Sequence, residues 1–313
     1  MAFGREVGAV YLALVRVMVP ALLIVKGLEL AGATAWIAWV LSPLMQLVGL
    51  PEGVGIVWAA ALLTNLYTAM AVYAGFAAGE SLTVAQVTVL GVLMLVAHSL
   101  PVEGAVAKAV GVRWRATLAL RLGGALGLGA LLNLAFSAGG WLQAPARMLW
   151  QPQASENGLA AWALDQLVML GWILVIIAAL MALLRLLRLL GIERLMHALL
   201  APVLRGIGIR REAANITIVG ATLGISFGAG LLIREARSGT LSRRDIFLTM
   251  AFLGLCHSVI EDTLLILVLG ADLSGILWAR LAFALVVTAV LARIPALNRR
   301  LAELPDEVPA GTR

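Results

Sequence analysis

Two copies of a His-Ser pair are the side chains in this sequence best suited to chemistry. His98-Ser99 and His257-Ser258 each lie inside a long apolar stretch, and the chain contains only three histidines. Counted along a helix from the charged residues Lys108 and Arg244, the two histidines lie roughly 15 to 20 Å deep, near the middle of a bilayer. Ionisable groups at that depth are costly, and they usually line a path for a solute, an ion or a proton. We therefore expect both pairs to face the interior of the protein.

Carboxylates accompany both pairs. Glu261 and Asp262 follow His257 and Ser258 at a spacing of four residues, which places each pair on one helical face. Glu103 and Arg121 are equidistant from an expected turn, as are Asp262 and Arg280, so antiparallel helices would bring each acid and its arginine to one depth. We expect Glu103–Arg121 and Asp262–Arg280 to be structural ion pairs, and the His-Ser pairs to be the functional groups.

The two His-Ser pairs belong to a longer internal repeat. They are 257 − 98 = 159 residues apart, and the same offset superposes other residues of the two halves. A coincident His-Ser pair is hard to attribute to chance in a chain with three histidines. The superposed residues include Gly32 and Gly191, Pro43 and Pro202, Gly49 and Gly208, Glu103 and Asp262, Gly111 and Gly270, and Arg121 and Arg280.

The composition indicates the environment in which these residues act. Hydrophobic residues make up 62% of the chain and charged residues 13%, with a mean hydropathy of +1.01, whereas soluble proteins carry about 25% charged residues. Apolar runs without strand-like alternation predict an all-α integral membrane protein. The net charge of +6 does not indicate nucleic-acid binding, because the arginines lie at the ends of apolar runs. The single cysteine, Cys256, excludes an intramolecular disulfide.

Each half is predicted to contain the same five segments: a spanning helix, an interfacial helix, a Gly-rich re-entrant hairpin and two more spanning helices. The first repeat covers residues 1–137 and the second covers residues 164–300. An extracytoplasmic linker over 138–163 joins them, and a solvated tail covers 301–313. In order, the segments are Val10 to Ala31, Trp36 to Leu50, Val54 to Gly79, Thr83 to Ala107 and Arg113 to Ser137, then Leu164 to Leu190, Ile192 to Gly208, Ala213 to Ser238, Arg243 to Gly270 and Leu273 to Ile294.

The distribution of basic residues favours re-entrant hairpins over two additional crossings. With hairpins, each half crosses the membrane three times and the second repeat is inverted relative to the first. Nearly all arginines then lie on one face, and only Lys26 and Arg147 remain for the other. Under the positive-inside rule this asymmetry places both termini in the cytoplasm and the protein in the bacterial inner membrane.

The expected hairpin tips carry small polar residues and glycines. Thr64-Asn65-Leu66-Tyr67-Thr68 in the first half aligns with Leu223-Gly224-Ile225-Ser226-Phe227 in the second. Such residues permit broken helices whose free backbone groups can bind a solute or an ion.

Two segments resemble the nucleoside-recognition (Gate) domain family of bacterial membrane proteins. They are the stretch Gly220 to Ile233 and the motif Cys256-His257-Ser258-Val259-Ile260-Glu261-Asp262-Thr263. That domain also occurs in spore maturation proteins and in the membrane part of the bacterial ferrous-iron permease, and it is similar to the core of concentrative nucleoside transporters. The resemblance implies inverted repeats and a substrate cleft between hairpin tips and partly unwound helices. The solute contacts that it implies, together with Thr68 from the first tip, are Thr64, Asn65, Tyr67, His98, Ser99, Ser226, Phe227, His257, Ser258 and Glu261.

The leading hypothesis is an elevator-like secondary active transporter of a small polar solute, with nucleosides and nucleobases as candidates. The coupling ion would be a proton or sodium, and His98, His257 and Glu261 are the candidate coupling groups. We expect no cofactor, no fixed metal ion and no enzymatic activity, because no nucleophile and base set is evident. The expected partners are the lipid bilayer, the solute, the coupling ion and further copies of the chain.

Two alternatives remain open. The first is divalent metal transport, because the side chains of this region include soft and hard ligands. Those candidate ligands are His98, Glu103, Cys256, His257 and Glu261. The second is a membrane assembly or signalling partner that transports nothing, in which the buried polar groups only brace the fold.

Overall fold

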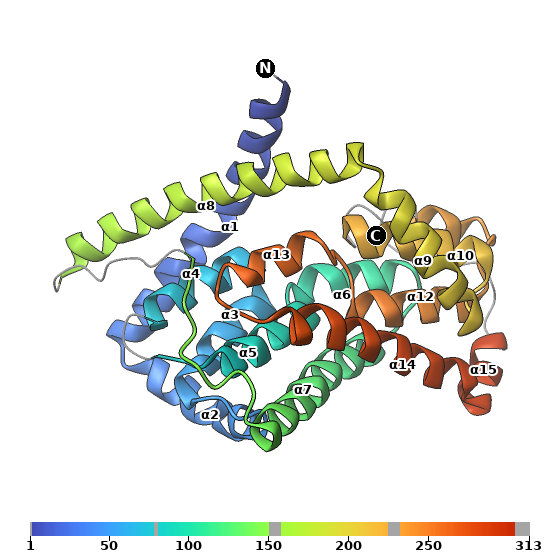
Figure 1. Cartoon of the computed structure of the whole chain (residues 1–313), viewed down its shortest axis with the longest axis horizontal. Coiled ribbons are helices and arrows are strands. Elements are labelled where there is room, and N and C mark those ends of the chain that lie inside the picture. Colours follow the sequence, from blue (N-terminus) through green and yellow to red (C-terminus); the bar gives the residue numbers. More distant parts are fainter. Residues whose placement is uncertain (1, 78–80, 150–157, 225–231, 304–313) are drawn as a thin grey trace.

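The computed structural model describes residues 2–77, 81–149, 158–224 and 232–303, and no strand occurs in these ranges (Figure 1). Five helical segments within them are long and apolar enough to cross a membrane. A sixth is added if a pair bent by 106°, Trp36–Leu47 and Glu52–Leu63, counts as one span. The chain is therefore an all-α, multi-pass membrane protein, as the composition predicted. The five segments are Phe3–Leu30, Val84–Ala109, Trp114–Gly139, Leu159–Leu189 and Ser274–Arg293.

Two helices, α5 (Val84–Val96) and α12 (Arg243–Leu255), form the centre of the molecule. Nearly all residues of both helices are buried, because they carry runs of Val, Leu, Met and Phe on every face. They are enclosed by α7 (Trp114–Gly139) and α14 (Arg280–Arg293), and a π-helical turn, η2 (Ser274–Ala279), leads into α14. A helix that is apolar all round belongs in such an interior.

The element bounds repeat with the period found in the sequence. Helix α2 (Ala33–Leu47) and helix α9 (Ile192–Gly206) begin and end 159 residues apart, and so do α5 and α12. Helix α1 (Ala2–Leu30) ends 159 residues before the end of α8 (Leu159–Leu189). Glycines with positive φ also occur in pairs at this offset, namely Gly32 and Gly191, Gly49 and Gly208, and Gly111 and Gly270.

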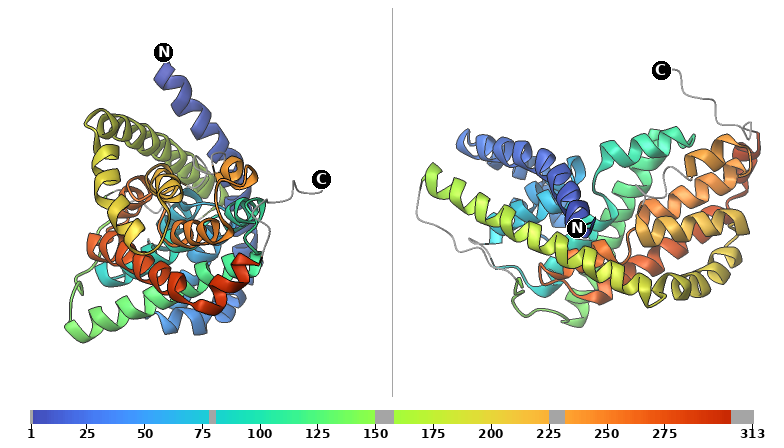
Figure 2. Two further views of the ribbon diagram at one scale, coloured as in Figure 1. Left: turned by 90° about the vertical axis from the view of Figure 1, so that its right-hand side faces the viewer. Right: turned by 90° about the horizontal axis from the view of Figure 1, so that it is seen from above.

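Helices α1 and α8 are the peripheral ones. Helix α8 packs against α1 and α9 and runs along the outside of the helical bundle, as the two views of Figure 2 show. Large apolar side chains of α8 are exposed, among them Leu167 and Val175. An exposed apolar surface on a spanning helix is the surface that lipid covers.

The first Gly-rich segment forms two short helices. After the turn η1 (Glu52–Val54), α3 (Gly55–Leu63) and α4 (Leu66–Ala77) pack against each other across a break at Thr64 and Asn65. They contain 9 and 12 residues, or roughly 14 and 18 Å, so neither alone crosses a hydrocarbon core of about 30 Å. Two short helices that pack against each other are what a hairpin requires, and the re-entrant course of this segment stays a prediction.

The second Gly-rich segment begins with α10 (Arg211–Leu223), and residues 232–237 are again helical. Residues 225–231, which include most of its expected tip, lie outside the described residues. The spanning segment expected over 243–270 is divided into α12 and α13 (Glu261–Leu267), and its counterpart is divided into α5 and α6 (Leu100–Ala109).

The linker and the tail differ in detail from the expectation. Linker residues pair with the start of α5, where the amides of Val84 and Ala85 donate to the carbonyl oxygens of the exposed Ala144 and the half-buried Leu142. The linker is therefore attached to the bundle there. A final helix, α15 (Pro295–Ala302), extends past the expected boundary at residue 300.

The two central helices begin with side-chain caps. We expect the Thr83 cap to make a measurable contribution to the free energy of unfolding. Thr83 Oγ1 accepts from the Gln86 amide, and the Gln86 side chain accepts from the Thr83 amide. Thr83→Ala should destabilise the protein by about 1 kcal/mol, because it leaves a helix-terminal donor without a partner. Unfolding of purified protein in mixed micelles measures this, with Thr83→Ser as the control. Equal stability of the alanine and serine variants would contradict the prediction.

Candidate functional site

The candidate site is built at the two breaks in the central helices. Helix α5 ends at Val96 and α6 begins at Leu100, while α12 ends at Leu255 and α13 begins at Glu261. Each break contains a serine with a left-handed backbone, Ser99 with φ 46° and Ser258 with φ 44°. This conformation is uncommon for a residue other than glycine, and it persists only where the surrounding structure imposes it.

Both histidines are held in one orientation by the helix that precedes them. His98 Nδ1 lies 2.9 Å from the Met94 carbonyl oxygen, and His257 Nδ1 lies 2.7 Å from the Leu253 carbonyl oxygen. Because a carbonyl oxygen only accepts, Nδ1 must carry the hydrogen in each ring. The Nε2 atom of a neutral ring then presents a lone pair to the interior.

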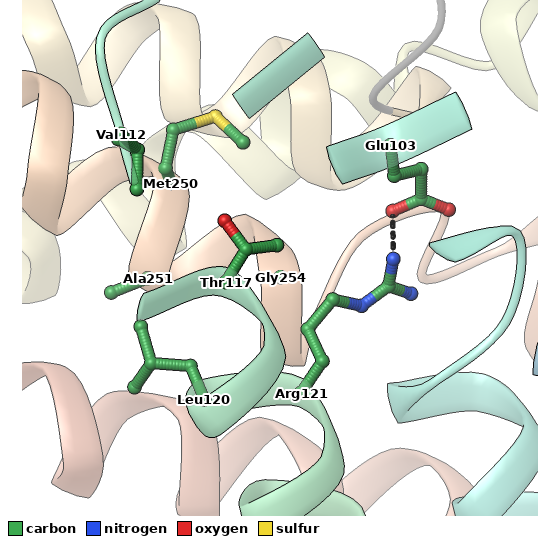
Figure 3. A pocket seen from close by; sticks show the side chains of 8 residues that line it. All are labelled: Glu103, Val112, Thr117, Leu120, Arg121, Met250, Ala251 and Gly254. Atoms are coloured by element: carbon green, nitrogen blue, oxygen red, sulfur yellow. Dashed lines mark hydrogen bonds and ion pairs between the residues drawn. The ribbon is translucent and has the colours of Figure 1, made fainter. Parts of the chain in front are cut away.

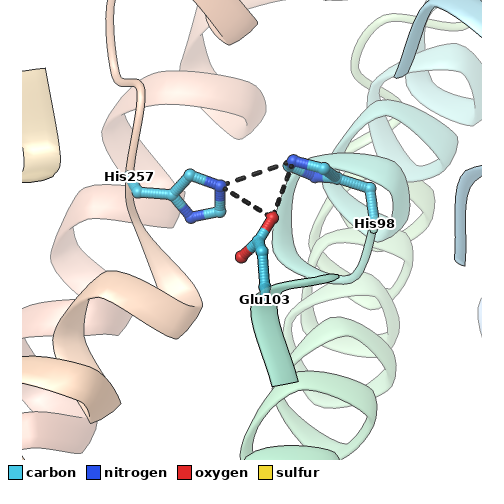
Figure 4. Close-up of side chains that lie close together, drawn as sticks. All are labelled: His98, Glu103 and His257. Carbon is cyan, nitrogen blue, oxygen red and sulfur yellow. Dashed lines mark hydrogen bonds and ion pairs between the residues drawn. The ribbon is translucent and has the colours of Figure 1, made fainter. Parts of the chain in front are cut away.

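The two imidazoles meet, as the repeat predicted. Their Nε2 atoms are 3.4 Å apart, and Glu103 Oε1 lies 3.3 Å from His98 Nε2 and 3.4 Å from His257 Nε2 (Figure 4). Asp262 Oδ2 lies 4.0 Å and 3.9 Å from the same two nitrogens. All four residues are buried. We call His98, Glu103, His257 and Asp262 the central cluster; each half of the chain contributes one histidine and one acid.

The Glu103–Arg121 ion pair is confirmed. Arg121 reaches from α7 to Glu103 on α6, with its Nη1 atom 2.7 Å from Glu103 Oε2 (Figure 3). Its Nε atom donates to the carbonyl oxygen of Val96, the last residue of α5. The arginine therefore compensates a buried charge and also satisfies the backbone at the break.

The expected Asp262–Arg280 ion pair is absent from the described residues. Arg280 donates instead to the carbonyl oxygens of Leu255 and His257, and Asp262 Oδ2 has no hydrogen-bond partner. The second break is longer, covering 256–260 against 97–99, so the start of α13 presents Asp262 to the histidines. The two arginines therefore brace their breaks in the same way, but only Arg121 forms an ion pair.

A cavity of about 220 Å³ opens beside the central cluster, and we call it the central cavity. Seven of the predicted solute contacts line it: Asn65, Tyr67, His98, Ser99, His257, Ser258 and Glu261. The remaining lining residues are Leu14, Leu66, Val102, Glu103, Gly224, Asp262 and Leu265.

The other predicted contacts are placed differently. Thr64 and Thr68 are not part of the cavity lining. Thr64 Oγ1 donates to the Ala60 carbonyl oxygen, and Thr68 Oγ1 donates to Asn65 Oδ1. Their small hydroxyls satisfy local backbone and side-chain groups instead. Ser226 and Phe227 lie outside the described residues.

Neither Glu103 nor Asp262 was among the predicted solute contacts: Asp262 was assigned a structural role, and Glu103 a structural role or that of a metal ligand. The structure places both in the cavity lining. The sequence signal that could have identified them is their position within a few residues of His98 and His257. Cys256 is buried next to His257 but is not part of the compact group of possible ligands, which consists of His98, Glu103 and His257 among the described residues. Glu261 is outside this group too, and it accepts a hydrogen bond from Tyr67.

Hydrogen bonds connect the two Gly-rich segments to the breaks. The Ser99 amide donates to the Ala61 carbonyl oxygen and the Ser99 hydroxyl donates to the Thr64 carbonyl oxygen. In the second half, the Val259 amide donates to the Ala221 carbonyl oxygen at 2.8 Å. Each break therefore shares its backbone hydrogen bonds with the neighbouring Gly-rich segment.

Gly224 allows a close approach between the second Gly-rich segment and the second break. It has φ 91°, and a methyl group built on it would lie 2.5 Å from Ser258 Oγ. We expect Gly224→Ala to cost about 1–3 kcal/mol, because an alanine is strained in this conformation and also displaces Ser258. Gly171→Ala on α8 is the control, since no atom lies within 4 Å of the added group. Unfolding in mixed micelles should separate the two variants, and equal stabilities would contradict the expectation.

Comparison with known proteins supports the membrane assignment. No family model matches the chain, and no solved structure matches it. Over 281 residues, covering 88% of each chain, it is 28% identical to a protein of Bacillus subtilis (strain 168) named uncharacterized membrane protein YvoD. The chain is therefore similar, over most of its length, to a bacterial membrane protein.

Proposed function

We propose that this protein is a membrane transporter of a small polar solute, which binds in the central cavity. The observation that carries the proposal is the burial of two histidines and two acids beside a cavity at the breaks of two central helices. Buried ionisable residues in membrane proteins usually line a transport path rather than serve packing. Broken helices that meet near the membrane midplane are a common way to build such a site.

The lining suggests the kind of solute. Acceptor atoms predominate in it, including the carboxylates of Glu103, Glu261 and Asp262. The volume is below the roughly 300–1,000 Å³ that is usual for drug-sized ligands. A compact solute rich in hydrogen-bond donors, such as a nucleobase, suits both properties better than a bulky or anionic solute.

The proposal includes the architecture expected from the resemblance to Gate-domain proteins. The two repeats would lie inverted in the bacterial inner membrane, with both termini in the cytoplasm. The hairpins and the broken helices, which share backbone hydrogen bonds, would move together against the outer helices. Further copies of the chain would supply the oligomeric scaffold.

Binding and transport by purified protein test this proposal. A thermal-shift screen of nucleobases, nucleosides and other small polar compounds identifies a solute, and counterflow in proteoliposomes measures its transport. Tyr67 donates to Glu261 across the cavity, so Tyr67→Phe should weaken solute binding by roughly tenfold.

Tyr73→Phe is the matched control for that variant. Tyr73 is a buried tyrosine on the same helix, and it is not part of the cavity lining. Tyr73→Phe should therefore leave solute binding unchanged. If no compound shifts the melting temperature, or if the unmodified protein transports none of the compounds that do, the transport proposal is wrong and the role of an assembly partner gains support. If Tyr67→Phe binds and transports the identified solute as the unmodified protein does, the placement of the solute in the central cavity is wrong.

A further inference from the structure

We propose that the central cluster binds one divalent transition-metal ion, held by His98 Nε2, His257 Nε2, Glu103 Oε1 and Asp262 Oδ2. This inference goes beyond the proposed function, because it assigns a specific ion to specific atoms and does not depend on which organic solute the cavity takes.

The first argument is the arrangement of lone pairs. The Nδ1 hydrogens of both histidines are used by the carbonyl oxygens of Met94 and Leu253. The two Nε2 atoms and Glu103 Oε1 therefore present acceptor atoms to one another at 3.3–3.4 Å. Buried acceptors at that separation repel each other unless a cation lies between them.

The second argument is the match of these distances to a metal site. Zinc in a tetrahedral site has ligands at about 2.0–2.1 Å, so its ligand atoms lie about 3.3 Å from one another. The two Nε2 atoms and Glu103 Oε1 lie 3.3, 3.4 and 3.4 Å apart. Asp262 Oδ2 is only slightly farther from both nitrogens, at 4.0 and 3.9 Å. The two Nε2 atoms and Glu103 Oε1 thus have the mutual distances of three ligand atoms around a tetrahedral ion. A small shift of Asp262 would bring Oδ2 to the fourth ligand position.

The third argument concerns the groups behind the ligands. A histidine that binds a metal almost always donates its other ring hydrogen to a carbonyl or carboxylate oxygen, as both histidines do here. Glu103 is oriented by Arg121 through its second oxygen. Asp262 Oδ2 is buried without a hydrogen-bond partner, which leaves it free to act as a ligand.

The chemistry of the set indicates the class of ion. Imidazole nitrogens with carboxylate oxygens suit zinc, iron and similar first-row ions, whereas calcium and magnesium prefer oxygen alone. Neither neighbouring guanidinium donates a hydrogen bond to the four proposed ligand atoms, because Arg121 pairs with the far oxygen of Glu103 and Arg280 binds backbone carbonyls. Zinc is therefore the natural probe.

Metal titration of purified full-length protein tests the inference. The protein is stripped with a chelator in detergent, titrated calorimetrically with ZnCl₂, and analysed for bound zinc by elemental mass spectrometry. We expect one ion per chain. His98→Ala and His257→Ala should each weaken binding at least a hundredfold, since each removes a direct ligand.

The third histidine provides the control. His197 lies on α9, outside the cluster, so His197→Ala should bind zinc as the unmodified protein does, as should Cys256→Ala. Cobalt absorption of the unmodified protein gives an independent readout, because a tetrahedral Co²⁺ site absorbs strongly in the visible range. This measurement needs no variant, so it remains valid even if an alanine variant fails to fold.

Three outcomes would overturn the inference. The first is the absence of zinc binding below about 100 μM, which would mean that a shared proton is the cation of the cluster. The second is binding that depends on His197, and the third is binding that is unchanged in both His98→Ala and His257→Ala. None of these measurements uses an organic solute or a transport assay, so a negative result would leave the proposed transport function to its own test.

Discussion

Arg121→Met is expected to lower the unfolding free energy by about 3–5 kcal/mol, because it leaves the buried Glu103 carboxylate without its ion-pair partner. Glu103 is 6% exposed and Arg121 is 1% exposed, so water cannot replace the lost interaction. The variant also removes the donor to the Val96 carbonyl oxygen. Urea unfolding of the purified protein in mixed micelles measures the change.

A double variant separates the charge effect from the packing effect. Adding Glu103→Gln to Arg121→Met should recover part of the lost stability, since no buried charge then remains unpaired. Arg280→Met is the matched control: its guanidinium binds two backbone carbonyl oxygens without an ion pair, so Glu103→Gln should not relieve its effect. If Arg121→Met is as stable as the unmodified protein, the ion pair has no structural role.

Ser99→Val is expected to lower the unfolding free energy by about 2–4 kcal/mol. A β-branched residue is strongly disfavoured at φ 46°, at about 1–3 kcal/mol, and the hydrogen bond to the Thr64 carbonyl oxygen is also lost, at about 1 kcal/mol. The same unfolding measurement applies. The hairpin α3–α4 should also lose part of its attachment to the α5–α6 break, which limited proteolysis can detect.

Ser99→Gly distinguishes the two contributions. Glycine adopts the left-handed conformation without strain, so this variant should lose only the hydrogen bond and remain close to the unmodified protein. Ser137→Val, at an exposed helical position on α7, should change stability by no more than about 0.5 kcal/mol. Equal destabilisation by valine and glycine at position 99 would mean that the backbone conformation carries no strain.

Much of the architecture could be predicted from the sequence because lipid leaves few choices. Apolar runs must become helices in a bilayer, and the offset of 159 residues relates the bounds of α2 to those of α9 and the bounds of α5 to those of α12. The same offset predicted that His98 and His257 are equivalent, and the short distance between their imidazoles follows from the pairing of two equivalent breaks.

The remaining details depend on where each helix breaks, and composition does not determine that. Pro101, for example, lies in the first turn of α6, just after the break. Glu103 and Asp262 are equivalent in the repeat, yet only Glu103 pairs with its arginine. A difference of two residues in the length of a break changes the direction of a side chain, and no periodicity in the sequence records it.

Two contacts join opposite halves of the chain. The Tyr67–Glu261 hydrogen bond connects residues 194 positions apart, and the contact between the two imidazoles connects residues 159 positions apart. A polypeptide of half this length could assemble the same chamber only by associating with a second copy of itself. Because both halves belong to one chain, the equivalent acids need not be identical, and Glu103 and Asp262 indeed have unequal partners.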